Sequence, residues 1–169
     1  MKLYAREKVL TLRDRFRFFN EKDEDVFLVE GKFWSFTKQL TMTDPLGNEV
    51  ALIKEKFLTF LPRFTVLQNG AEVASIQKRF TFLRPKYTLE YKGWDIEGDV
   101  WSHNYSIVDG VRTVATVHKR WFTIGDVYEL DIADPADAVL VAAVVLCIDC
   151  VDERQAAASS ASASNASSN

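Results

Sequence analysis

A short apolar run near the end of the chain restricts the possible folds more than any other feature. Residues 138–148 (AVLVAAVVLCI) are eleven consecutive apolar residues, and Asp149 follows them directly. Eleven residues of α-helix measure about 16 Å at 1.5 Å per residue, well short of a hydrocarbon core of roughly 30 Å. Asp152 and Glu153 then close this end with charge. A transmembrane span is therefore not expected.

The residues before the run favour the start of a helix. Asp134 can cap free backbone N–H groups, Pro135 suits the first turn, and Asp137 places negative charge where the helix dipole favours it. The valines of the run would also fit a central strand, but its alanines and the capped start favour a helix over about residues 135–151. A helix that is apolar on every side must be surrounded by protein.

The middle of the chain contains a weak repeat. Four copies are present: VFLVEGKF (26–33), VALIKEKF (50–57), VASIQKRF (73–80) and VATVHKRW (114–121). In each copy the first position is Val, the second and fourth are apolar, the seventh is basic and the eighth is aromatic. Apolar residues with a period of two are typical of a strand with one buried face.

Turn signals separate the strand-like segments. They are DPLGN (44–48), QNG (68–70) and VDG (108–110), each typical of a tight hairpin. We expect roughly ten to twelve short strands between residues 8 and 133, joined as an antiparallel meander. Repeat spacings of 24, 23 and 41 residues are too unequal for a propeller or solenoid. A closed barrel needs its interior filled, and the apolar helix can fill it.

A meander followed by an apolar helix ending in Ile-Asp resembles the tubby C-terminal-like superfamily, and within it the LURP-one-related family. The matching residues are 138–149 with Asp152 and Glu153, and the repeats at 50–57, 73–80 and 114–121. The resemblance covers residues 1–153. It implies a mainly β fold, a closed antiparallel barrel of about twelve strands around a central C-terminal hydrophobic α-helix, as in tubby proteins and phospholipid scramblases. The proline-rich, cysteine-rich N-terminus and acidic calcium-binding segment of scramblases have no counterpart here.

The resemblance also implies a function, because tubby domains bind phosphoinositide headgroups through basic residues. It predicts a non-enzymatic module that binds anionic phospholipid headgroups, and a protein–protein interaction or scaffold domain without a lipid ligand is the alternative. The candidate headgroup residues lie in or beside the repeats: Lys78, Arg79, Arg84, Lys86, Lys119 and Arg120. Converging at one rim, they could bind phosphates. The same charges also fit a solvated outer face that discourages edge pairing.

Asp149 is predicted to be a structural anchor for the helix. A carboxylate at the edge of a core is costly to bury without hydrogen bonds, so its partner should be a donor at the barrel mouth or an arginine. Cys147 and Cys150 are expected to be buried and inert, since they lie at the C-terminal end of the helix and lack a second ligand pair. His103 and His118 show neither nucleophile nor metal spacing. No catalytic residue, metal site or cofactor is predicted.

Charge and composition limit the partners and the location. The chain carries 21 basic and 24 acidic residues, a net charge of −3, so no nucleic-acid partner is expected. The first sixteen residues show no apolar signal region, which predicts a cytoplasmic location, peripheral to a membrane if lipid is bound. Residues 156–169 contain only Ala, Ser and Asn. We therefore expect one domain over residues 1–153 and a disordered tail over 154–169.

Overall fold

The described residues form twelve strands and one long helix. The computed structural model describes residues 1–7, 15–31, 37–57, 59, 61–79, 86–91, 93–100, 102–120 and 127–166. The strands are β1 (Lys2–Glu7), β2 (Arg15–Phe19), β3 (Asp25–Gly31), β4 (Gln39–Thr43), β5 (Glu49–Glu55), β6 (Arg63–Gln68), β7 (Ala71–Arg79), β8 (Lys86–Glu90), β9 (Trp94–Asp99), β10 (Asn104–Asp109), β11 (Arg112–Arg120) and β12 (Val127–Ile132). A 3₁₀ turn, η1 (Pro135–Asp137), leads into the helix α1 (Ala138–Ala166).

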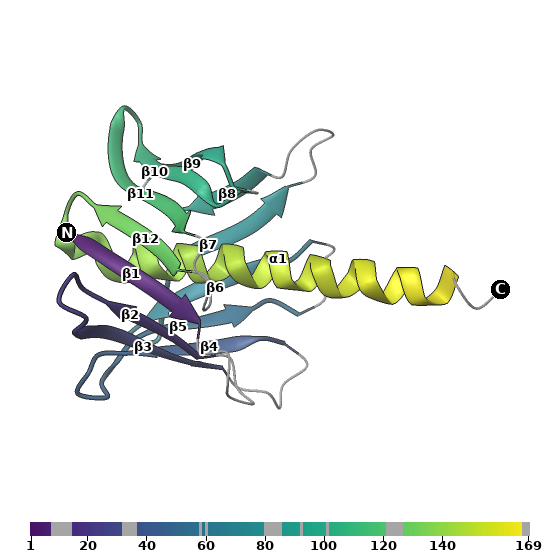
Figure 1. The fold of residues 1–169 in the computed structure, drawn as a ribbon, viewed down its shortest axis with the longest axis horizontal. Coiled ribbons are helices and arrows are strands. Elements are labelled where there is room, and N and C mark those ends of the chain that lie inside the picture. The colour runs from purple at the N-terminus through teal and green to yellow at the C-terminus, as the bar shows by residue number, and fades with distance from the viewer. Residues whose placement is uncertain are drawn as a thin grey trace.

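The strands form one antiparallel sheet that wraps into a nearly closed barrel. Their order is β8-β7-β6-β5-β4-β3-β2-β1-β12-β11-β10-β9. Strands that are consecutive in the sequence therefore pair with each other, except β8 and β9, and β1 also pairs with β12. The two ends of this order, β8 and β9, lie next to each other. Figure 1 shows the strands arranged around α1. The predicted barrel of about twelve strands around a C-terminal helix is confirmed. One strand, β1, lies before residue 8, where the predicted strands begin.

Each repeat forms one strand with the predicted inward face. The copies lie in β3, β5, β7 and β11. Their second and fourth positions are all buried: Phe27, Val29, Ala51, Ile53, Ala74, Ile76, Ala115 and Val117. The hairpins follow the turn signals as well. Asn69 and Gly70, for example, adopt φ angles of 49° and 78°, the left-handed pair that a type I′ turn requires. Local alternation and turn chemistry therefore suffice to define these strands.

The apolar run fills the barrel. Asp134 accepts a hydrogen bond of 2.9 Å from the backbone N–H of Ala136 and caps the start of η1. From Ala138 to Ile148 every residue except Val139 is buried, and Val139 is partly buried against the same core. The helix contacts β5, β6 and β7 most. It supplies the core that a wide barrel lacks, which is the arrangement predicted from its uniform hydrophobicity.

The helix continues beyond its predicted end. The sequence predicted a central helix over about residues 135–151; α1 continues to Ala166, and its last part projects beyond the strands (Figure 1). Alanine is the best helix former, and each added residue extends an existing helix at little entropic cost, so the Ala-rich segment can continue the helix. The division of the chain into a domain and a tail stays a prediction. No helix in the described residues has the length and hydropathy needed to cross a membrane.

Candidate functional site

The ends of the four repeats lie at one rim of the barrel. Because neighbouring strands are antiparallel throughout the sheet, the odd-numbered strands all run in the same direction. Consequently β3, β5, β7 and β11 end together, at Gly31, Glu55, Arg79 and Arg120. We call this end of the barrel the exit rim, because α1 leaves the barrel there (Figure 1). The fold thus gathers repeat ends that are up to 89 residues apart (Gly31 to Arg120).

Three of the six candidate headgroup residues, Lys78, Arg79 and Lys86, lie on the paired strands β7 and β8. The backbone of Lys78 pairs with Tyr87, and Arg79 pairs with Lys86. These positions lie where β7 ends and β8 begins, at the exit rim. Arg84 lies outside the described residues. Lys78, Arg79 and Lys86 are therefore neighbours across two paired strands.

The other two candidates, Lys119 and Arg120, point to opposite sides of β11, as successive residues of a strand must. The ammonium of Lys119 lies 5.5 Å from the ring centroid of Tyr128. Arg120 instead forms an ion pair with Glu129 on the neighbouring strand. The two cations therefore have different surroundings, and only Arg120 lies on the outer wall.

Glu129 is a carboxylate on the polar side of β12 that is only 8% exposed. It pairs with Arg120 and, at 3.3 Å, with the ammonium of Lys2. The hydrogen bond from Lys2 to Glu129 raises the pKa of that ammonium above 10.5. Glu129 alternates with the buried Tyr128 and Leu130 along β12, and its two partners come from β1 and β11. The structure therefore neutralises a nearly buried charge with residues that are distant in sequence.

A polar cluster surrounds the helix where it leaves the core. Asp149 accepts a hydrogen bond of 2.8 Å from the hydroxyl of Tyr128, so a tyrosine fulfils the expectation of a donor at the barrel mouth. One turn later, Asp152 accepts a hydrogen bond of 3.0 Å from Tyr87. The Nε2 atom of His103 lies 4.0 Å from Asp152 Oδ2. These contacts join α1 to β8, β12 and the β9–β10 turn.

The remaining titratable residues fit a structural role. Cys147 and Cys150 are both buried, and burial raises the pKa of Cys147 well above 9.0, which disfavours the reactive thiolate. His118 is exposed, and its Nδ1 lies 3.0 Å from Asn104 Oδ1. Within the described part of the chain, no three His, Cys, Asp or Glu residues are grouped closely enough to hold a metal ion.

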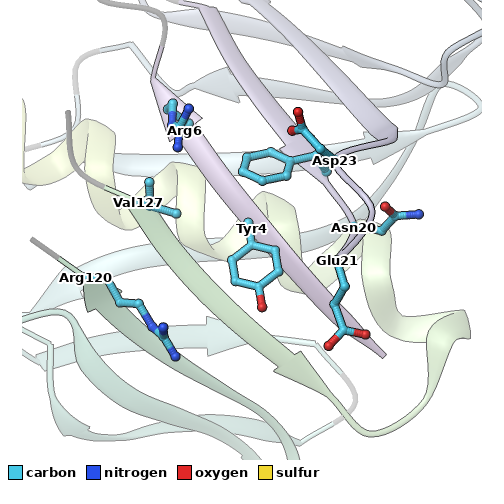
Figure 2. Close-up of a pocket in the computed structure, with 8 residues that line it drawn as sticks. Tyr4, Arg6, Asn20, Glu21, Asp23, Arg120 and Val127 are labelled. Atoms are coloured by element: carbon cyan, nitrogen blue, oxygen red, sulfur yellow. The ribbon is translucent and has the colours of Figure 1, made fainter. Parts of the chain in front are cut away.

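A groove of about 370 Å³ lies on the outer wall and was not predicted from the sequence. It is lined by Tyr4, Arg6, Phe19, Asn20, Glu21, Asp23, Arg120 and Val127 (Figure 2). Tyr4 and Arg6 alternate with the buried Leu3 and Ala5, a pattern that is visible in the first residues of the chain. The groove needs β2, β12 and β11 beside β1, and this arrangement comes from long-range pairing.

Aromatic rings and guanidinium groups form the wall of the groove. The ring centroids of Tyr4 and Phe19 are 5.6 Å apart and the rings are stacked. The guanidinium of Arg6 lies 5.7 Å from the Phe19 centroid. Val127 pairs with Arg6 on one side and with Arg120 on the other. Two basic side chains therefore flank one apolar residue.

Acidic residues occupy the β2–β3 turn at the opposite side of the groove. The side chain of Asn20 accepts hydrogen bonds from the backbone N–H groups of Lys22 and Glu24, at 2.9 and 3.0 Å, and so shapes the turn. Glu21 and Asp23 lie within this turn, and Asp23 forms an ion pair of 2.7 Å with Arg17. The groove is therefore basic on one side, acidic on the other, and aromatic between them.

Comparison with known proteins gives three results. The sequence model of a family described as LURP-one-related matches residues 1–149. The chain is 31% identical to the uncharacterized protein YxjI of Bacillus subtilis (strain 168) over 151 residues, which cover 89% of this chain and 93% of that protein. An X-ray structure of an Arabidopsis thaliana protein is similar with a TM-score of 0.57 at 12% identity, covering 88% of this chain and 91% of that one. The last likeness shows the fold alone.

Proposed function

The chain belongs to the LURP-one-related family, and from this premise we propose that it is a non-enzymatic module that binds anionic phospholipid headgroups, phosphoinositides included, at the exit rim. The bound protein would be cytoplasmic and peripheral to the membrane. The observation that carries this proposal is the common end of the four repeats, each with a basic residue at its seventh position. Of these basic residues, Lys56, Arg79 and Arg120 lie in the described part of the chain. Positive charge at one end of the barrel favours contact with an anionic membrane surface.

Phe57 gives further support. It follows Lys56 in the second repeat, and 63% of its surface is exposed, while the side chain of Lys56 is 43% exposed. An aromatic ring beside a cation suits the membrane interface, where the ring can enter the headgroup layer and the charge can pair with phosphate. The filled barrel supports a non-catalytic role. The helix α1 occupies the interior that could otherwise hold a substrate.

The test is co-sedimentation with vesicles. Vesicles of phosphatidylcholine containing a phosphoinositide should bind the protein, and pure phosphatidylcholine vesicles should bind it much less. Replacing Lys78 and Arg79 by Glu should weaken vesicle binding by roughly tenfold or more. Each basic residue near the membrane surface contributes about 1 kcal/mol to the binding free energy. The matched control reverses Lys22 in the β2–β3 turn and Arg112 at the start of β11, two exposed residues at the opposite rim. It should bind as the unmodified protein does.

Three outcomes would contradict the proposal. Binding could be absent, equal for both vesicle types, or equally reduced by both pairs of substitutions. Absent binding would favour the scaffold alternative, in which the barrel serves only as a platform for another protein. Binding at the rim should also weaken as salt is raised, since charges at a surface are screened over about 10 Å at 0.1 M ionic strength.

A further inference from the structure

The groove on the outer wall (Figure 2) carries charges of both signs, and not all of them form ion pairs within the protein. Arg120 has Glu129 as its partner and Asp23 has Arg17. Among the described residues, no carboxylate pairs with Arg6 and no cation pairs with Glu21. One positive and one negative side chain therefore remain available to a ligand.

The available charges lie at opposite ends of an aromatic surface. Figure 2 shows Tyr4 between Arg6 and Glu21, with Val127 and Arg120 along the same side as Arg6. Stacking against Phe19 holds the Tyr4 ring against the wall. A volume of about 370 Å³ suits a molecule of few atoms. A ligand that spans the groove would contact a cation, then a ring, then a carboxylate.

We propose that this groove binds a small zwitterion, whose phosphate or carboxylate lies against Arg6 and whose ammonium lies against Glu21. A guanidinium donates paired hydrogen bonds to either anionic group. An ammonium is stabilised both by a carboxylate and by the face of a tyrosine ring. A simple anion would meet Glu21 and Asp23, and a simple cation would meet Arg6, so the groove discriminates against both.

This inference does not rest on the proposed lipid binding at the exit rim. The groove shares only Arg120 with the six candidate headgroup residues. Its ligand could come from two sources, a free compound such as phosphoethanolamine or the zwitterionic headgroup of a membrane lipid. The shared chemistry is an ammonium joined by a short linker to an anionic group.

Titrations followed by backbone amide NMR test the proposal directly. The probes are phosphoethanolamine and β-alanine as zwitterions, inorganic phosphate as the anion alone, and ethanolamine as the cation alone. We expect the zwitterions to bind about five- to tenfold more tightly than either half, with shifts centred on β1 and the β2–β3 turn. Equal affinity for phosphate and phosphoethanolamine, or no saturable shift with any probe, would overturn the proposal.

Variants separate the two ends of the site. Glu21→Gln should weaken phosphoethanolamine binding about fivefold and leave the weak affinity for phosphate unchanged or higher, whereas Arg6→Gln should weaken both. Glu97→Gln on β9 and Lys54→Gln on β5 are matched controls, because both residues are exposed and distant from the groove, and neither should alter binding. If Glu21→Gln behaves like Glu97→Gln, the assignment of the ammonium is wrong.

Vesicles distinguish the source of the ligand. Binding to phosphatidylethanolamine vesicles that free phosphoethanolamine displaces would identify a lipid headgroup, and binding of the free compound alone would identify a soluble metabolite; either result supports the site. Reversal of Lys78 and Arg79 should leave phosphoethanolamine binding intact even if it abolishes binding to anionic vesicles. Failure of one proposal is therefore distinguishable from failure of the other.

Discussion

Tyr128 on β12 donates a hydrogen bond of 2.8 Å from its hydroxyl group to Asp149 on α1. The contact links the wall of the barrel to its central helix at the point where the apolar run ends. A hydrogen bond to a carboxylate is stronger than one between neutral groups. It can therefore determine how deeply the helix sits, as well as contributing to stability.

Tyr128→Phe should lower the free energy of unfolding by about 1–3 kcal/mol, because a partly buried carboxylate loses a donor. The measurement is urea unfolding followed by circular dichroism. Tyr4→Phe is the matched control, since its ring lies on the outer wall, and it should change stability by less than about 0.5 kcal/mol. If the two variants are equally stable, the anchoring role of Asp149 is not supported.

Val144→Asp should prevent folding of the whole barrel. Val144 is 1% exposed and lies in the middle of the apolar run, so the new carboxylate would be desolvated in the core at a cost above about 4 kcal/mol. Val111→Asp is the control, because Val111 lies fully exposed in the β10–β11 turn. A folded Val144→Asp protein with a normal melting temperature would contradict the central position of α1.

Asp44 should make the stability of the β4–β5 turn depend on pH. Its carboxylate accepts hydrogen bonds from the side chain and backbone of Asn48, which hold its pKa below 3.8. A carboxyl group whose pKa is lowered by folding stabilises the native state above its unfolded pKa, and this contribution is lost as the pH falls through the folded pKa. Asp44→Asn should therefore be less stable than the unmodified protein near pH 7, with a difference that shrinks below 3.8. A pH-independent difference in urea unfolding would contradict this assignment.

Truncation after Asp152 should remove helical signal without unfolding the barrel. Of the deleted residues, 153–166 belong to α1, whose last part projects beyond the strands (Figure 1). Far-ultraviolet circular dichroism should show the loss of helix, while the melting temperature should change by less than about 2 °C. A fall of more than about 5 °C would mean that the projecting segment packs against the barrel.

Much of the fold could be predicted from local patterns. The period of two in the repeats identified the buried residues of β3, β5, β7 and β11, and the uniform hydrophobicity of residues 138–148 identified the central helix. The helix α1 continues past the predicted end of the central helix near residue 151, because an Ala-rich segment can extend a helix with no core to bury. Composition alone could not distinguish such an extension from a disordered chain.

The candidate sites depended much more on tertiary structure. Alternation along a strand is a local property of the backbone, so a strand over the fourth repeat already places Lys119 and Arg120 on opposite faces. The strand that gives Tyr4 and Arg6 one face, β1, was not predicted. Which charges meet across that face was decided by strand pairing between residues more than a hundred positions apart, as when Arg6 lies opposite Val127 and brings Arg120 into the same groove. Register between distant strands depends on how the whole barrel closes. Most strands and the central helix can therefore be predicted from the sequence. The groove and the partners of Asp149 and Glu129 form only in the folded barrel.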